Sequence, residues 1–264
     1  MISIYDSNLI TVYCTVVALI FGACMGSFLN CTAIRICRGE SFVKGSSHCM
    51  SCGHDLSWKD LIPVVSWVML GGKCRYCGAK ISARYPIVEV IFALITAACL
   101  LKFDLTLLCL RNFIYLAVLY LLTLTDIDSM TIPDSCHVIM IAVWAATAYF
   151  LYDTSEILMR VAAAFVFGGG VLAVSLIMDH VMHRDTLGGG DIKLLFVIGL
   201  FHGFVGTLFV LILSCLLGLT FNICLMKKSN NEDGFPFGPW IAAAAAVVLF
   251  TGDPLINWYL GLIR

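Results

Sequence analysis

Charged residues are scarce in this chain. Only 12% of its 264 residues are Asp, Glu, Lys or Arg, whereas 61% are hydrophobic and the mean hydropathy is +0.97. One soluble core of this length would not bury so much apolar surface, so the composition argues against an ordinary soluble domain and predicts a membrane protein. The formal net charge is −1, which gives no reason to expect a nucleic-acid partner.

Long polar segments are few as well. The apolar residues form runs of the length that spans a bilayer, about 17 to 25 residues. We expect transmembrane helices at 9–28, 87–103, 107–125, 135–152, 157–178, 190–203, 204–226 and 239–260. The stretch 190–226 is too long for a single span at about 1.5 Å per residue, so it is expected to fold back at residues 201–203.

The start of the chain lacks the features of a cleavable signal peptide. No basic residue precedes the first apolar run, and no small-residue cleavage site follows before a turn expected at Gly26-Ser27. The first run is therefore predicted to be a permanent helix.

Basic residues are distributed unevenly around these runs. The segment between the first two runs holds half of the 16 basic residues: Arg35, Arg38, Lys44, Lys59, Lys73, Arg75, Lys80 and Arg84. By the positive-inside rule this segment is cytoplasmic. Counting through the eight expected spans places both chain ends outside and Lys227 and Lys228 inside. The inside loops and flanks then hold 12 of the basic residues, and the outside ones hold only Lys102, Arg111, Arg160 and Arg264.

Four cysteines stand in this basic segment with the spacing of a metal site. Cys49 and Cys52 form one Cys-x-x-Cys pair and Cys74 and Cys77 form a second, each followed by glycine. Four thiolates spaced in this way can close a tetrahedral zinc site, and the reducing cytosol disfavours disulfides. A closed site of this kind would be structural. The alternative is a thiol relay in a membrane oxidoreductase.

Acidic residues close to the bilayer are functional candidates because a charge there is costly. Asp126 and Asp128 close the third run, and Asp191 opens the sixth after three glycines. By the span count both places lie at the cytoplasmic face, so the carboxylates can meet. Two close carboxylates share a proton, as in aspartic proteases. The alternatives are a helix N-cap for Asp191 and a polar relay in a transporter, although a transport site is expected near the midplane.

Several motifs occur in an order that is specific to one family. They are Gly26–Asn30 (GSFLN) with Arg35, the two cysteine pairs, IPVVSW at 62–67, CRYCGAKISARYPIVE at 74–89, Asp126 followed by Ile132-Pro133-Asp134, Gly188-x-Gly190-Asp191 with Lys193, and FPFGP at 235–239. With these motifs the chain resembles the type IV prepilin peptidases over nearly its whole length. The resemblance implies an enzyme of the bacterial inner membrane that cleaves the short basic leader of prepilin-like proteins (pilins or pseudopilins) at the cytoplasmic face. In many members it also methylates the new amino terminus with S-adenosylmethionine.

The resemblance also implies roles for individual residues. The catalytic pair falls on Asp126 and Asp191, with Asp128 as a secondary rival for the first role. No glycine-rich dinucleotide-binding fingerprint is present. S-adenosylmethionine therefore rests on the resemblance alone, with Asn30, Arg35 and Glu89 as candidate contacts.

Two alternatives accompany these assignments. Glu89 can instead form an ion pair with Arg84. A non-methylating intramembrane Gly-x-Gly-Asp protease would share the two carboxylates, but it would lack the segment 30–86.

The expected fold is an all-α polytopic membrane protein with about eight transmembrane helices and a small cytoplasmic zinc-ribbon-like module. Residues 1–30 are predicted to be the first transmembrane helix, 31–86 the four-cysteine zinc-binding module, and 87–264 the membrane-embedded aspartic peptidase domain. The expected partners are prepilin-like substrates and the lipid bilayer.

Overall fold

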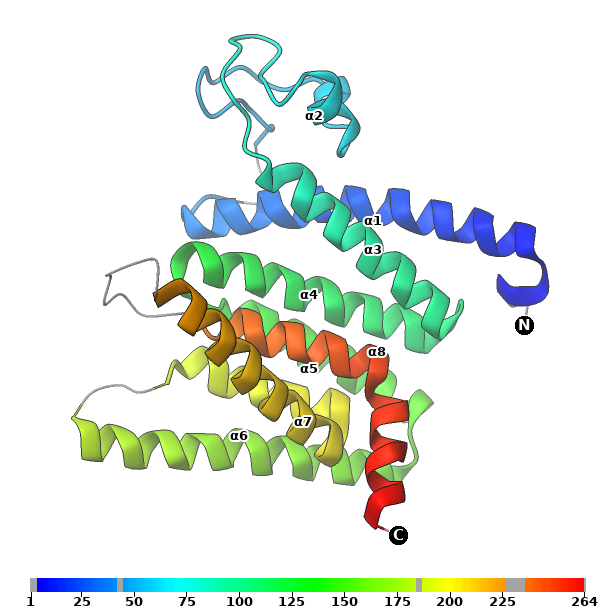
Figure 1. Cartoon of the computed structure of the whole chain (residues 1–264), viewed down its shortest axis with the longest axis vertical. Helices are drawn as coiled ribbons and strands as arrows, with labels where there is room; N and C mark the ends of the chain where they lie inside the picture. Colours follow the sequence, from blue (N-terminus) through cyan, green and yellow to red (C-terminus); the bar gives the residue numbers. More distant parts are fainter. Residues whose placement is uncertain (1–3, 42–44, 184–186, 227–235, 264) are drawn as a thin grey trace. The chain divides into compact units, whose positions relative to one another are not determined.

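The computed structural model describes residues 4–41, 45–183, 187–226 and 236–263. These ranges contain helices and two isolated β-bridges but no strand, which confirms the expected all-α class (Figure 1). The helices are α1 (Asn8–Cys37), α2 (Val65–Met69), α3 (Arg84–Phe103), α4 (Leu107–Ser129), α5 (Asp134–Leu151), α6 (Thr154–Met182), α7 (Gly189–Met226) and α8 (Gly238–Ile263), with short 3-10 turns at Ile4–Asp6 (η1) and Trp58–Asp60 (η2).

Six of the described helices are long and apolar enough to cross a membrane: α1, α3, α4, α5, α6 and α7 as far as Phe221. Helix α8 adds a shorter apolar stretch, Gly238–Gly252. The number, length and composition of these helices indicate a multi-pass membrane protein. The chain divides into two compact units, Met1–Phe113 and Ile114–Arg264.

The first unit is built on the pair α1 and α3. Helix α1 continues to Cys37, so the turn expected at Gly26-Ser27 is wrong. Gly26 instead lies against α3, because a Cβ there would be 3.1 Å from the Cα of Glu89. In this helix glycine marks a close helix contact of the kind common in membrane proteins, which a sequence alone does not distinguish from a turn.

The second unit packs its core from α4, α5, α6, α7 and α8. Its fully buried side chains include Tyr115, Leu122, Met140, Ile198 and Ile241. Because lipid is as apolar as these side chains, close van der Waals packing has to hold the helices together.

Helix α7 is broken at Gly203, whose φ of 66° and ψ of −167° are not helical. Figure 1 shows the chain reversing there between the yellow and gold halves of α7, so the expected fold-back at residues 201–203 is confirmed. Arg160 of α6 donates to the carbonyl oxygen of Phe201 at 2.6 Å. The guanidinium therefore satisfies a free carbonyl at the end of the first half, where the helix dipole favours a cation.

The contact between α6 and α7 generates a prediction. A Cβ at Gly199 would lie 2.4 Å from the Cα of Ala164, so Gly199→Ala should force the helices apart and cost about 1–3 kcal/mol. Gly170→Ala on α6 is the matched control, because a Cβ there meets no atom within 4 Å. Thermal unfolding in detergent should show a lower midpoint for Gly199→Ala only. Equal midpoints for the two variants would contradict this packing.

Candidate functional site

The four cysteines of the first unit form one cluster. The sulfur atoms of Cys49, Cys52, Cys74 and Cys77 all lie within 4.8 Å of one another. The Cys49 and Cys77 Sγ atoms are 3.9 Å apart, and a tetrahedral zinc site with Zn–S bonds of about 2.3 Å requires sulfurs about 3.8 Å apart. Backbone N–H groups of Cys52 and Ser51 lower the pKa of the Cys49 thiol to about 6, which favours the thiolate that metals bind. The residues therefore fit a zinc ion.

Both cysteine pairs are shaped by the same backbone turn. In each, the first Cys N–H donates to the carbonyl five residues on, and the glycine N–H donates back to that Cys carbonyl. The bonds are Cys49 to His54 (2.9 Å) and Gly53 to Cys49 (2.9 Å), and Cys74 to Ala79 (2.8 Å) and Gly78 to Cys74 (3.0 Å). The local sequence alone thus arranges each pair of thiols.

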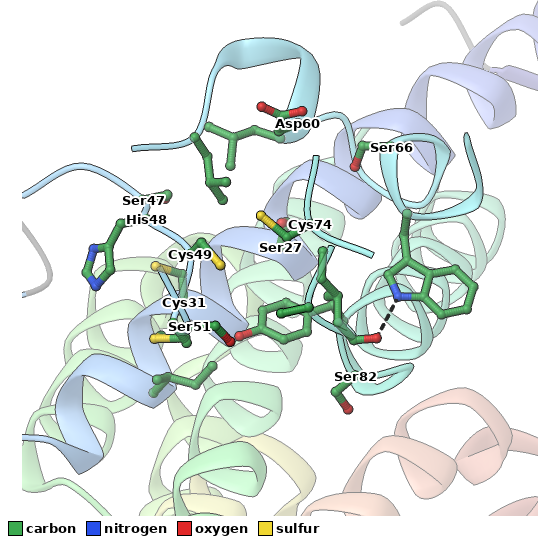
Figure 2. A pocket seen from close by; sticks show the side chains of 18 of the residues that line it. Ser27, Cys31, Ser47, His48, Cys49, Ser51, Asp60, Ser66, Cys74 and Ser82 are labelled. Atoms are coloured by element: carbon green, nitrogen blue, oxygen red, sulfur yellow. Dashed lines mark hydrogen bonds between the residues drawn. The ribbon is translucent and has the colours of Figure 1, made fainter. Parts of the chain in front are cut away.

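A pocket of about 390 Å³ lies in the same unit, between the cysteine loop and parts of α1 and α3. Figure 2 shows Cys49 and Cys74 in its wall together with Cys31 of α1. This volume is within the range of small-molecule sites, about 300–1,000 Å³. Arg35 and Glu89 line the pocket. Asn30 does not line it, but is buried with its Oδ1 atom unpartnered.

Two charged side chains in the pocket wall are fixed by hydrogen bonds. Arg35 Nη2 donates to the carbonyl oxygens of Gly45 and Ser46, both at 3.1 Å, and so ties α1 to the cysteine loop. The Asp60 carboxylate is only 3% exposed and accepts from Arg75 Nε at 2.7 Å. The Arg75 hydrogen bond lowers the pKa of Asp60 to about 2, so this group is ionised at neutral pH.

Glu89 holds a strained turn at the pocket edge. Its buried carboxylate accepts from the Val64 N–H at 2.7 Å. Val64 has φ 61° and ψ −51°, and the N–H of Val65 donates across it to the Pro63 carbonyl at 2.6 Å. This γ-turn is an unfavourable conformation for a β-branched residue, and it persists only where neighbouring groups enforce it.

The second unit brings the two candidate carboxylates near each other. Asp126 is buried in the last turn of α4, whereas Asp128 is exposed. Asp191 lies in the first turn of α7, so it is not the N-cap of that helix, and its Oδ1 atom is buried with no partner. Ile132 links the two sites, because a Cβ on Gly190, directly before Asp191, would lie 3.0 Å from the Ile132 Cβ. A Cβ on Gly238 would lie 3.1 Å from Ile132 Cδ1 and 2.7 Å from Asp126 Oδ2.

The N-terminus of helix α8 lies beside Asp126. A Cβ on Gly238, its first residue, would lie 2.7 Å from Asp126 Oδ2, so only glycine lets the backbone approach the carboxylate this closely. The free N–H groups and the dipole at a helix N-terminus stabilise negative charge. The FPFGP motif therefore supports Asp126, a role that sequence reasoning missed.

His137 is a further residue that sequence reasoning missed. It is buried on α5, and its Nε2 atom lies 3.2 Å from the carbonyl oxygen of Gly190, directly before Asp191. Its Nδ1 atom lies 3.9 Å from Asp134 Oδ1, which also binds Lys193 Nζ at 2.7 Å. The only signal in the sequence was a histidine one turn after the Ile-Pro-Asp motif.

A cavity of about 430 Å³ adjoins the glycine turn. It is lined by Gly188 and Gly189 and by Ser175 and Asp179 of α6. Backbone without side chains at this edge leaves room for an extended chain beside Asp191.

Comparison with known proteins identifies the family. Residues 20–103 match the bacterial peptidase A24 N-terminal domain, and residues 113–223 match the type IV leader peptidase family. A Bacillus subtilis (strain 168) protein named prepilin leader peptidase/N-methyltransferase is 31% identical over 245 residues, which cover 91% of this chain and 96% of that protein. This chain belongs to the type IV leader peptidase family. A protein of the same name from Aeromonas salmonicida is 32% identical over 224 residues, 82% of this chain and 75% of that protein. No solved structure gives a significant match.

The two matched regions of this leader peptidase family member coincide with its two compact units. The unit boundary falls after Phe113, where the second match begins. The cysteine cluster and the pocket thus lie in the region matched to the N-terminal domain, and Asp126 and Asp191 lie in the region matched to the leader peptidases.

The turn at Val64 generates the prediction of this section. Glu89→Ala removes the acceptor of the Val64 N–H, so amide hydrogen exchange across residues 58–69 should speed up. Glu40→Ala is the matched control, because Glu40 is an exposed acid lining the same pocket. Exchange measured by mass spectrometry in detergent checks this. An unchanged rate in Glu89→Ala would show that the carboxylate does not hold the turn.

Proposed function

We propose that this protein cleaves the leader of type IV prepilin-like substrates with Asp126 and Asp191 as the catalytic pair, and then N-methylates the new amino terminus. The observation that carries the proposal is the approach of the buried Asp126 of α4 and the half-buried Asp191 of α7, around Ile132, within the region that matches the leader peptidase family. Relatives that match most of the chain carry a name for both activities.

The cleavage step needs no covalent intermediate. Water attacks the scissile carbonyl while one carboxylate takes its proton, and the other carboxylate protonates the amine as the C–N bond breaks. The leader leaves with a carboxylate and the mature protein with a free amino terminus. The N-terminus of α8 stabilises the negative charge that the pair carries.

The membrane arrangement is part of the proposal. The protein has about eight spans, two of which are the halves of the broken α7. With this count, the end of α4 and the start of α7 lie at the cytoplasmic face of the bacterial inner membrane. Residues 1–30 form the first span, 31–86 the cytoplasmic module and 87–264 the peptidase domain. A substrate with a basic leader in the cytosol and an apolar helix in the bilayer presents its scissile bond at this level. The cavity beside Gly188 and Gly189 would receive it.

We assign a structural zinc ion to the four cysteines. A closed four-thiolate site leaves no position for substrate, so its contribution is to fold the loop. The matching turns of the two Cys-x-x-Cys pairs support zinc over a thiol relay.

The pocket of the first unit is proposed to bind S-adenosylmethionine, which supplies the methyl group. Arg35 offers a cation for its carboxylate, and Glu89 and Asp60 offer acids for its positively charged groups. Asn30 is retained as a candidate, because an unpartnered buried amide is costly without a ligand or a water molecule.

Two alternatives are less well supported. A polar-relay transporter would hold its carboxylates near the midplane, whereas Asp126 and Asp191 lie in terminal turns of their helices. A non-methylating Gly-x-Gly-Asp protease would not explain the match of residues 20–103.

The dyad is tested by isosteric substitution. Asp126→Asn and Asp191→Asn should each lower leader cleavage by about 10²-fold or more, because an amide can neither accept nor hold the shared proton. The double variant should be no worse, since the two act as one unit. Asp128→Asn is the matched control and should cost less. The assay is co-expression with a prepilin-like substrate and a gel shift, with protein level checked. Substantial cleavage by either single variant would refute the dyad.

The zinc assignment is tested by metal analysis. The purified protein should carry about one zinc per chain, and Cys49→Ser should lose most of it. Cys215→Ser changes an exposed cysteine of α7 and should keep it. Absence of metal together with four readily alkylated thiols at these positions would contradict a zinc site.

The methyl-donor pocket is tested by separating the two activities. Arg35→Gln should abolish methylation and leave cleavage, because Arg35 lies in the pocket of the first unit and the carboxylates lie in the second. Arg38→Gln, at an exposed position next to the end of α1, is the control. Mass spectrometry of the processed substrate measures both the loss of the leader and the methylation of the new amino terminus. Normal methylation by Arg35→Gln would remove this residue from the site.

A further inference from the structure

The segment from Trp58 to Met69, comprising η2 and α2, turns its large apolar side chains outward. The apolar stripe consists of Trp58, Ile62, Val65, Val68 and Met69, which are 39% to 81% exposed and do not line the pocket. Val65, Val68 and Met69 have the spacing i, i+3, i+4 of one face of α2. Trp58 belongs to η2, and Ile62 to the turn between η2 and α2.

The opposite side of this segment carries its polar and pocket-lining groups. Asp60, Ser66 and Trp67 line the pocket, with Asp60 bound to Arg75 and the Trp67 Nε1 atom donating to the Ile81 carbonyl at 3.2 Å. A segment on a water-exposed module should have the reverse polarity. Five large apolar side chains exposed within residues 58–69 mark a surface that something covers.

The contacts of α2 place its start at the level of the membrane surface. Val64 binds Glu89 of α3, and Glu89 lies against Gly26 of α1. Helix α1 continues for about 16 Å beyond Gly26, as far as Cys37. The start of α2 therefore lies about that far along α1 from its cytoplasmic end. The 30 residues of α1 span about 45 Å against a hydrocarbon core of about 30 Å. Gly26 is near the end of the apolar run 9–28, where α1 leaves the core.

We propose that the apolar stripe docks on the lipid surface, in the boundary between headgroups and acyl chains of the leaflet that α1 and α3 cross beside it. Trp58 suits this boundary, which tryptophan prefers. The neighbouring Lys59, with Nζ 5.5 Å from the Trp58 ring centroid, can reach lipid phosphate from there. The module is joined at both ends to membrane helices, so the docking surface is permanently close to lipid. This proposal does not depend on the catalytic assignment.

Fluorescence quenching by lipid tests the proposal. The full-length protein is placed at one copy per nanodisc in phospholipid with or without bromine on the upper acyl chain. The chain has five tryptophans, so subtracting the Trp58→Phe spectrum isolates the emission of Trp58. Brominated lipid should lower this emission about twofold or more, as for a side chain inserted at the interface.

Trp67 is the matched control in the same segment. It faces the pocket, so the emission isolated with Trp67→Phe should be unchanged by bromine. Equal zinc content of the variants shows that the module is folded. A Trp58 emission that bromine leaves unchanged would overturn the proposal. The Trp58 emission is then measured again with two copies of the protein in each nanodisc, and with a prepilin-like substrate added. A change in either measurement would show that the apolar stripe contacts that partner instead of lipid.

Discussion

The cost of holding two carboxylates among apolar helices governs the second unit. A buried charge needs partners, and the described chain offers Asp126 and Asp191 no basic side chain, because Lys193 is bound to Asp134. The N-terminus of α8 meets Asp126 and offsets part of this cost, whereas the buried Oδ1 atom of Asp191 has no hydrogen-bond partner among the described residues. This arrangement suits the proposed use of the two groups as a proton-sharing pair, which a salt bridge would abolish.

The first unit solves a different problem, since the described residues between 38 and 83 contain only one turn of 3-10 helix and the short α2. So little regular structure cannot bury a core of its own, and small modules of this kind depend on metals or other cross-links. The four cysteines come together within the loop, where the proposed zinc ion would cross-link it, and Glu89 and Arg35 tie the loop to α3 and α1. Two of the residues expected to contact the cofactor thus also hold the pocket in shape.

The features that the sequence predicted are those that short-range patterns encode. Apolar runs indicated the long helices, Cys-x-x-Cys-Gly indicated the thiol turns, and a long apolar run indicated the break at Gly203. The preference for Asp126 over Asp128 came from the family resemblance, and it agrees with the burial of Asp126. Contacts between distant residues left no such pattern. The contact of Gly238 with Asp126 and the hydrogen bond of Val64 to Glu89 could not be inferred, because only the packing of whole helices brings these residues together.

The outward-facing apolar side chains of the cysteine-containing module follow from its small size. The pocket needs charged groups on its inner wall, and a segment as short as Trp58–Met69 cannot also present a polar outer face and an apolar core. The apolar side chains are left outside, where water would penalise them by about 25 cal/mol for each square ångström exposed. A bilayer removes that penalty without any further protein. The module is therefore expected to be folded by three constraints acting together, a metal ion, two membrane helices and a lipid surface, and a fragment lacking the helices would lose two of them.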